Sequence, residues 1–330
     1  MMLHRRHILL TGAAAATGVF TTRRPARAAG RTLRIGYILP RQSQLGAGAT
    51  AFAEDVAKRT GGRITLQQFP DAALGGDVEL AKGVQLGSID LAFITGLGLS
   101  TVVPDAGVFN IPFLFRDLPH AYAVFDGPVG ASFSQRFAAK DMVMLAWGEN
   151  GLRHITNAKR PVVTPDDIKG LKMRVPQSQV FVSAFQALGV DVASLPFPQL
   201  YEALRSGKFD GQENPIATIQ AAKFDQVQKF LTLSGHAYDP AVFVMAPDAF
   251  DELSAEDKGH FAAAAKAGAA ASRRFAAEAA VAGIAALQKG GMTVQRDIDR
   301  AKFAAAMAPA NAGFEKQFGK ALIEQIKQAG

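Results

Sequence analysis

The feature that most constrains the fold is a run of 36 residues, from Ser254 to Lys289, that contains no proline and many alanines. Ser254 and Asp257 resemble a helix-capping pair at its start, and Gly290-Gly291 follows its end. At 1.5 Å per residue a helix of this length reaches about 54 Å, whereas a lobe of about 150 residues has a radius of gyration near ~15 Å. We therefore expect one helix that crosses two lobes; the alternative is two helices broken at a glycine, Gly268 or Gly283.

The rest of the chain alternates short β-rich runs with amphipathic stretches, which is typical of an α/β fold. A length of 330 residues indicates two domains rather than one. Val143–Trp147 and Val242–Ala246 are expected to be short strands, and Pro119–Lys140 a helix. We see no internal repeat and no low-complexity linker.

Residues 1–28 are typical of an export signal. Arg5-Arg6 precede the apolar run from Ile8 to Phe20, which is too short to span a bilayer. Ala26-Arg27-Ala28 resembles a cleavage site, so the mature protein is expected to begin near Ala29 and to be periplasmic. The paired arginines resemble a twin-arginine signal, and an ordinary secretory signal is the alternative.

Charge and composition exclude several classes of function. The net charge is +7, but the leader holds five arginines and no acid, which leaves 31 basic against 29 acidic residues in the remainder. This near-equal number of basic and acidic residues in the mature chain argues against nucleic acid as a partner. The chain has no cysteine, and its four histidines beyond the leader lack metal-ligand spacing. Gly96-Leu97-Gly98 lacks the third glycine of a dinucleotide-binding loop. No cofactor is indicated, and a ligand-binding protein is favoured over an enzyme.

Four blocks of sequence, spread over the mature chain, carry a resemblance to a known family. They are Phe109–Phe115 (FNIPFLF), Asn150–Asn157 (NGLRHITN), Asp167–Pro176 (DIKGLKMRVP) and Asp210–Pro215 (DGQENP). In this order and spacing they resemble the DctP-type solute receptors of tripartite ATP-independent periplasmic (TRAP) transporters.

The resemblance implies a two-lobed periplasmic-binding-protein fold of the α/β class, with a hinge and a long helix that spans both lobes. Lobe I corresponds to residues 30–150 plus about 240–279, and lobe II to 151–239 plus about 280–330. Such receptors bind an organic acid by its carboxylate and deliver it to the permease subunits in the membrane; they are not enzymes, and most are monomers. A receptor that presents its ligand to a membrane sensor, or an exported enzyme that acts on a small carboxylic acid, are the alternatives.

Arg174 is the foremost candidate for ligand binding, because it ends a predicted strand and a guanidinium matches a carboxylate with two parallel hydrogen bonds. The resemblance assigns it, together with Asn214, to the carboxylate of the ligand. Arg153 matches the second arginine of the family, in contact with the ligand or in a structural role. Glu213 either accepts a hydrogen bond from a ligand hydroxyl or braces an arginine, and Phe197 is expected to stack on the ligand body.

Five further residues are candidates from their positions at strand ends, helix starts and the expected hinge: Gln42, Asp77, Thr95, Trp147 and Tyr238. The resemblance also shows a departure: some relatives that bind polyhydroxylated acids have a carboxylate or an amide near Ile94–Gly98, where this chain has small and apolar residues. This implies a less hydroxylated ligand, such as a hydroxy-, keto- or aromatic monocarboxylate. A C4-dicarboxylate and a uronate also remain open.

Overall fold

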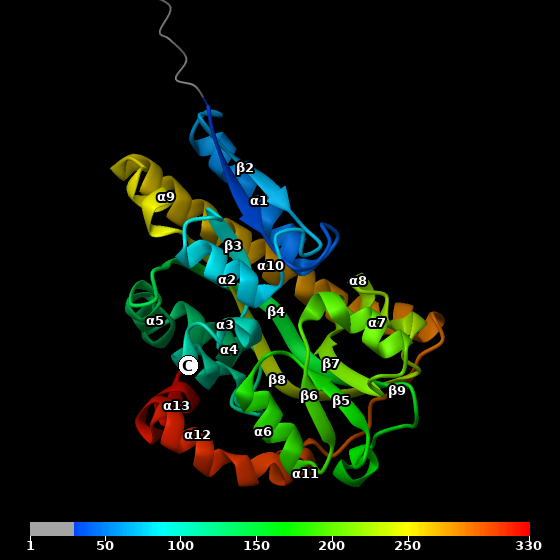
Figure 1. The fold of residues 1–330 in the computed structure, drawn as a ribbon. Coiled ribbons are helices and arrows are strands. Elements are labelled where there is room, and N and C mark those ends of the chain that lie inside the picture. Colours follow the sequence, from blue (N-terminus) through cyan, green and yellow to red (C-terminus); the bar gives the residue numbers. More distant parts are fainter. Residues whose placement is uncertain (1–29) are drawn as a thin grey trace, which may run out of the picture.

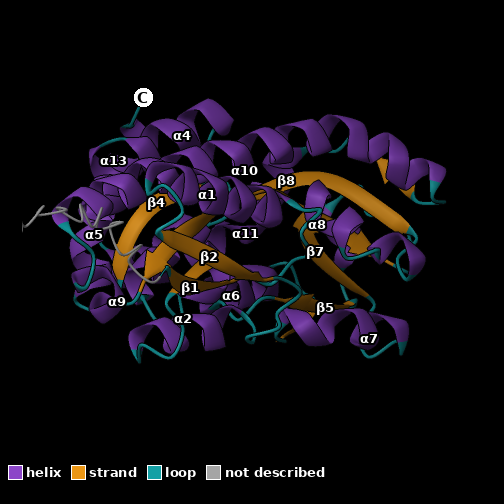
Figure 2. Ribbon diagram, turned by 90° about the horizontal axis from the view of Figure 1, so that it is seen from above, coloured by secondary structure: helices purple, strands orange, loops and turns teal. Residues whose placement is uncertain are grey.

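The computed structural model describes residues 30–330, so the predicted export signal, residues 1–28, lies outside the described residues. Between residues 30 and 330, no helix combines the length and the apolar character needed to cross a membrane. This part of the chain folds into one mixed sheet of nine strands with helices on both faces (Figure 1; Figure 2).

Two long antiparallel strands form the middle of the sheet and run through both halves of the molecule. The strand order is β2-β1-β3-β8-β4-β7-β5-β6, with β9 beside β8. The strands β3, β1 and β2 therefore flank one end of the β4–β8 pair, and β7, β5 and β6 flank the other. The bounds are β1 (Arg31–Gly36), β2 (Ile64–Phe69), β3 (Leu91–Thr95), β4 (Val143–Asn157), β5 (Lys172–Val175), β6 (Asp191–Ser194), β7 (Gly211–Pro215), β8 (Phe230–Met245) and β9 (Thr293–Gln295).

Helices cover the sheet and close the ends of both lobes. The α-helices are α1 (Gln44–Arg59), α2 (Asp77–Gln85), α3 (Gly96–Leu99), α4 (Leu118–Asp126), α5 (Pro128–Ala138), α6 (Gln179–Ala187), α7 (Leu200–Arg205), α8 (Ile216–Ala221), α9 (Pro247–Asp251), α10 (Ala255–Lys289), α11 (Arg300–Met307), α12 (Asn311–Phe318) and α13 (Lys320–Gln328). Five 3₁₀ turns complete the order: η1 (Pro104–Asn110), η2 (Pro165–Ile168), η3 (Phe197–Gln199), η4 (Phe224–Gln226) and η5 (Ala308–Ala310).

The helix α10 is continuous over 35 residues, which confirms the predicted long helix. Its N-cap Ser254 accepts a hydrogen bond from the amide of Asp257. Gly268 and Gly283, the two alternative break points, lie inside the helix where it touches neighbouring helices. A β-carbon on Gly268 would come within 2.7 Å of the Gly48 carbonyl oxygen in α1, and one on Gly283 within 2.3 Å of the Gln220 side chain in α8. They let α10 pack closely against one helix of each lobe.

The apolar core runs along both faces of the central strands. Phe93 of β3 and Phe243 of β8 stack with ring centroids 3.8 Å apart at 7°. This main cluster extends into both lobes, and a smaller one, which includes Leu200, Ile219 and Leu231, lies in the second lobe. The two lobes therefore share a continuous apolar core, as they share β4, β8 and α10.

The secondary structure differs from the prediction in two respects. Residues 119–140 form two helices, α4 and α5, because Gly127 breaks the first and Pro128 begins the second, a position where its missing N–H costs nothing. The strands expected over 143–147 and 242–246 are only the first and last parts of β4 and β8.

The last part of the chain also differs from the predicted division, which placed about 280–330 in the second lobe. The helix α11 lies against α6 and β8, but α13 reaches back to the first lobe (Figure 1). His120 of α4 hydrogen-bonds the carbonyl of Ile326 at 2.8 Å, and Arg116 donates to the carbonyl of Lys327. The chain end therefore packs on lobe I.

Candidate functional site

A small inner cavity lies where the two lobes meet. Its volume is about 20 Å³, which holds about one water molecule. Lobe I, the central strand β4 and lobe II all contribute to its walls. The lining residues are Ile38, Leu39, Asp77, Thr95, Asn150, Arg153, Arg174, Pro176, Phe197, Asn214 and Thr218. A molecule the size of an organic acid can reach this space only if the lobes separate.

Arg174 carries an unused hydrogen-bond donor into this site. It lies on β5 just before Pro176, and only 2% of its surface is exposed. Its Nε and Nη2 both donate to the carbonyl oxygen of Leu195, at 2.9 and 2.6 Å. Its buried Nη1 has no hydrogen-bond partner among the described residues. Burial lowers the pKa of Arg174 to about 9, which still leaves it cationic at neutral pH.

Arg153, in contrast, is fully engaged by protein groups. Its Nε and Nη2 contact the Glu213 carboxylate at 2.5 and 2.9 Å, and Nη1 contacts Asp239 at 2.8 Å. Nη2 also donates to the side-chain oxygen of Asn214 at 3.1 Å. Burial opposes its charge, but the two carboxylates outweigh that effect and raise its pKa. Arg153 thereby ties β4 to β7 and β8.

The two carboxylates around Arg153 differ in their own titration. Burial raises the pKa of Asp239 to about 6 in spite of Arg153. For Glu213, the attraction of Arg153 and a 3.2 Å contact with His236 outweigh burial and lower the pKa. Burial is also the main reason that the pKa of His236 is lowered. Glu213 does not line the cavity; it braces Arg153, which is one of its two predicted roles.

Asp77 and Thr95 form the lobe I wall of the cavity. The Asp77 carboxylate accepts hydrogen bonds from the Thr95 amide at 3.0 Å and the Thr95 hydroxyl at 2.8 Å. Burial raises the pKa of Asp77 to about 7, and these two hydrogen bonds limit the rise. A β-carbon on Gly98 would lie 2.3 Å from the Asp77 β-carbon. The Gly96-Leu97-Gly98 turn therefore lets the backbone approach the wall of this cavity.

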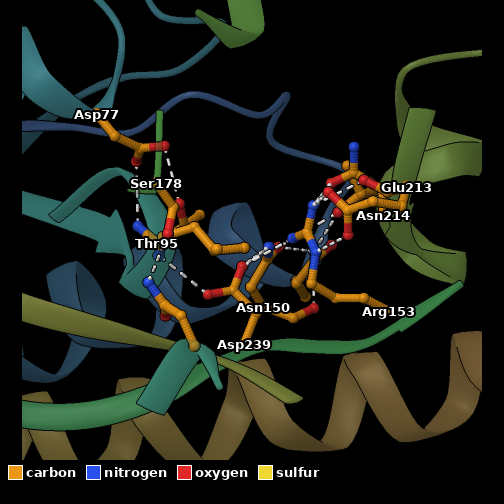
Figure 3. A network of polar contacts seen from close by, with 12 residues as sticks. Asp77, Thr95, Asn150, Arg153, Ser178, Glu213, Asn214 and Asp239 are labelled. Carbon is orange, nitrogen blue, oxygen red and sulfur yellow. Dashed lines mark hydrogen bonds and ion pairs between the residues drawn. The ribbon is translucent and has the colours of Figure 1, made fainter. Parts of the chain in front are cut away.

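An amide network connects these walls to the central strands (Figure 3). Asn150 donates to Asp239 at 2.7 Å and accepts from Gln44 at 2.7 Å, and Gln44 also contacts Thr218. Asn214 accepts from Arg153 and donates to Gln212. In this view Asn150 and Asp239 lie between two groups of labelled side chains, with Asp77, Thr95 and Ser178 on one side and Arg153, Glu213 and Asn214 on the other.

The structure brings together six of the ten predicted site residues at the cavity wall: Asp77, Thr95, Arg153, Arg174, Phe197 and Asn214. Sequence reasoning missed Asn150 and Thr218 among the polar lining residues. Asn150 begins the NGLRHITN block and Thr218 follows Pro215 by three residues, so both stood beside motifs already identified. Ile38 and Leu39, at the turn after β1, gave no signal because their residue types are typical of a core.

The structure places Trp147 and Tyr238 away from the cavity. Trp147 packs among phenylalanines and donates its indole N–H to the Gly130 carbonyl at 3.1 Å. Tyr238 packs against Phe115 and Phe125. Trp147 was chosen as a strand end and Tyr238 as part of a hinge return, but both lie inside the continuous strands β4 and β8.

Gln42 lines a larger outer groove of about 1030 Å³. Both lobes and the helix α10 contribute to this groove, which shares Ile38 and Phe197 with the inner cavity. Ile38 of lobe I and Phe197 of lobe II therefore stand between the groove and the cavity. The groove and the cavity are therefore neighbours.

The described residues 30–330 hold no group of three or more His, Asp or Glu side chains placed to share a metal ion. The polar groups at the cavity are instead suited to hydrogen bonding with a small molecule. The site offers a cation with a free donor in Arg174, a carboxylate in Asp77 and hydroxyls in Thr95 and Thr218, beside the apolar Ile38 and Phe197.

Comparisons with known proteins agree with this architecture. The sequence model of the family described as bacterial extracellular solute-binding protein, family 7 (DctP), matches residues 35–317. A solute-binding protein of Verminephrobacter eiseniae is 47% identical over 302 residues, which cover 92% of this chain and 90% of that protein.

Two solved structures are similar to this chain at a TM-score of 0.89. One is a TRAP periplasmic solute-binding protein of Polaromonas sp. JS666 bound to D-erythronate, with 42% identity over 91% of this chain and 99% of that one. The other is a TRAP periplasmic solute-binding protein of Bordetella bronchiseptica with density assigned to pantoate, with 43% identity over the same shares of the two chains.

Proposed function

Since this chain belongs to the bacterial extracellular solute-binding proteins of family 7 (DctP), we propose that it is a TRAP-transporter receptor that binds an organic acid by its carboxylate. The relatives described above support the ligand class. D-erythronate and pantoate, found with the Polaromonas and Bordetella proteins, are both hydroxylated monocarboxylates.

The observation that carries this proposal is the unused Nη1 donor of Arg174. A buried donor without a partner costs about 1–3 kcal/mol, and a buried cation without a counter-ion costs more. A ligand carboxylate at Arg174 would relieve both costs, because it would accept the free N–H and neutralise the charge. The low dielectric of the cavity would strengthen this contact relative to water.

Ligand binding is expected to drive closure of the two lobes. Arg174 and Asn214 belong to lobe II, whereas Asp77 and Thr95 belong to lobe I. A ligand that contacts both walls binds only the closed form with full affinity, so it shifts the population toward that form. The hinge consists of β4, β8 and α10, the elements that the lobes share.

The proposal also places the protein in the periplasm, as a monomer that delivers its ligand to membrane permease subunits. The export signal predicted for residues 1–28 supports the location. A receptor rather than an enzyme is supported by the matching family, which is described as extracellular solute-binding proteins.

A thermal-shift screen tests the proposal. Its panel contains short hydroxy acids, 2-oxo acids, C4-dicarboxylates, uronates and aromatic acids. An acid at 100 times its Kd is expected to stabilise the folded protein by about 2.7 kcal/mol. The matched control is the carboxamide of the same acid, which has the same shape but no charge, and it is expected to give no shift. Equal shifts for acid and carboxamide, or no shift with any acid, would contradict the proposal.

A further inference from the structure

We propose that Asp77 makes the inner cavity selective for acids with a single carboxylate and a hydroxyl at the far end, and that it rejects dicarboxylates. This inference rests on the proposed function, because it takes Arg174 as the site of the first carboxylate. It names Asp77 as the residue that contacts the other end of the ligand and selects the group found there.

The charges around the cavity provide for one ligand anion only. The charged residues in its lining are Arg153, Arg174 and Asp77. Arg153 already has Glu213 at 2.5 Å and Asp239 at 2.8 Å. Arg174 is therefore the one lining cation without a direct ion pair among the described residues; Glu213 and Asp77 act on its charge only from a greater distance. A second ligand carboxylate would enter a buried space without a cation to balance it.

The position of Asp77 determines which end of the ligand it faces. Asp77 starts α2 in lobe I, whereas Arg174 ends β5 in lobe II, so the two residues lie in opposite walls. A ligand held at Arg174 therefore extends toward Asp77 and Thr95. There a distal carboxylate would meet the Asp77 carboxylate at low dielectric, where like charges repel strongly.

A distal hydroxyl, in contrast, finds an acceptor at Asp77. Each Asp77 oxygen accepts one hydrogen bond from Thr95, and a carboxylate has about four acceptor positions. Lone pairs therefore remain for a ligand O–H. Asp77, which comes from another element than Ile94–Gly98, thus supplies a polar group on the lobe I wall.

The ionisation of Asp77 should tune this selectivity. The groups that act on it are Thr95 of β3, Asp239 of β8 and Arg174 of β5. Burial and the negative charge of Asp239 raise its pKa, Thr95 and Arg174 oppose the rise, and the result is about 7. Asp77 is mostly neutral at pH 6 and mostly charged at pH 8, so rejection of a second carboxylate should strengthen as the pH rises.

The test compares acids that differ only at the far end, by titration calorimetry. D-Erythronate and meso-tartrate share one carbon skeleton, in which a terminal CH₂OH is replaced by a carboxylate; 4-hydroxybutyrate and succinate form a second pair. At pH 8 the natural protein is expected to prefer the hydroxy acid of a pair by about tenfold or more, and Asp77→Asn to reduce that preference to about threefold or less. Asparagine keeps the shape: its Oδ1 can still accept from the Thr95 amide, and its Nδ2 can donate to the Thr95 hydroxyl, so this variant should fold.

The matched control is Asp71→Asn, which removes one acid from the outer groove without touching the inner cavity. Asp71 has a φ of 57°, a conformation that asparagine adopts well, so this variant should keep the preference. A second measurement needs no variant: in the natural protein the preference should fall at least about threefold from pH 8 to pH 6.

The outcomes separate the two proposals. Dicarboxylates that bind the natural protein as tightly as their hydroxy acids would overturn the inference and leave the receptor function standing. An unchanged preference in Asp77→Asn, or a preference that does not vary with pH, would also overturn it. If no organic acid bound at all, the proposed function would fail together with the inference.

Discussion

The two buried arginines beside the cavity show how the same residue type serves two purposes. Arg153 and Arg174 are exposed by only 1% and 2% of their surfaces. Arg153 has every guanidinium nitrogen engaged and two carboxylates as partners. Arg174 has one backbone carbonyl as its acceptor and a nitrogen without a partner. Burial alone thus does not distinguish the two arginines, whereas an unpartnered nitrogen that lines the cavity does.

Two buried acids in the same region repeat the contrast. Glu213 is paired with Arg153, and its pKa is lowered. Glu149 has the Tyr122 hydroxyl, at 2.5 Å, as its side-chain partner, and burial raises its pKa to about 7. A buried charged group with an oppositely charged partner contributes to the stability of the fold. A buried charged group without such a partner responds to pH or to a ligand.

The largest effect on stability is expected when Arg153, the arginine with two carboxylate partners, is replaced. Arg153→Met leaves Glu213 and Asp239 buried without a cation, so the free energy of unfolding should fall by about 3–5 kcal/mol. Urea denaturation measures this loss. The control is Arg205→Met, which breaks an exposed pair with Glu202 and should cost less than about 1 kcal/mol. Equal losses of stability in Arg153→Met and Arg205→Met would mean that the buried ion pairs of Arg153 stabilise the fold no more than an exposed pair does.

The same substitution at the uncompensated arginine should act on binding instead. Arg174→Met is expected to weaken binding of the organic acid found in the screen by about 2–5 kcal/mol, because it removes the charged partner of the carboxylate. Its loss of stability without ligand should be smaller than that of Arg153→Met, since no ion pair is broken. Calorimetry and urea denaturation measure the two quantities. An affinity within about threefold of the natural protein would exclude Arg174 as the anchor.

The smallest expected effect concerns Glu149 and pH. A carboxyl with a raised pKa adds stability at low pH and loses that contribution as the pH rises through the folded-state value. From pH 5 to pH 8, Glu149→Gln should therefore gain about 1–3 kcal/mol of stability relative to the natural protein. Urea denaturation at both pH values measures the gain. Asp77 and Asp239 titrate in both proteins, so the difference isolates Glu149; a constant difference would mean that Glu149 is ionised throughout.

Local patterns predicted the parts of the fold that depend on local causes. The helix α10 followed from a proline-free run with a capping serine, and the short strand β5 from a β-rich run that ends before Pro176. The continuity of β4 and β8 did not follow. Gly148, Gly151 and Pro240 interrupt their strand patterns, and pairing with distant neighbours keeps the strands intact.

The difference between the two arginines was likewise invisible in the sequence. The ion pair of Arg153 depends on the register that sets Ile155 opposite Glu213, and on Asp239 from a third strand. No local pattern encodes a register between segments about 60 residues apart. The resemblance implied that both arginines lie near the ligand, but only the structure shows that Arg174 is the one with an unpartnered N–H donor.

The hydrogen-bonded ladder of β4 and β8 has a mechanical consequence. The two strands pass through both lobes, and their register shifts at three places along the ladder. The lobes are therefore joined by a common two-stranded ribbon and not by a flexible linker. The register shifts at Glu149/Gly151 and Arg153/Ile155 bend and twist this ribbon between the lobes. We expect a connection of this kind to restrict the directions in which the lobes can move, so that the opposing walls of the cavity meet in the same geometry each time they close.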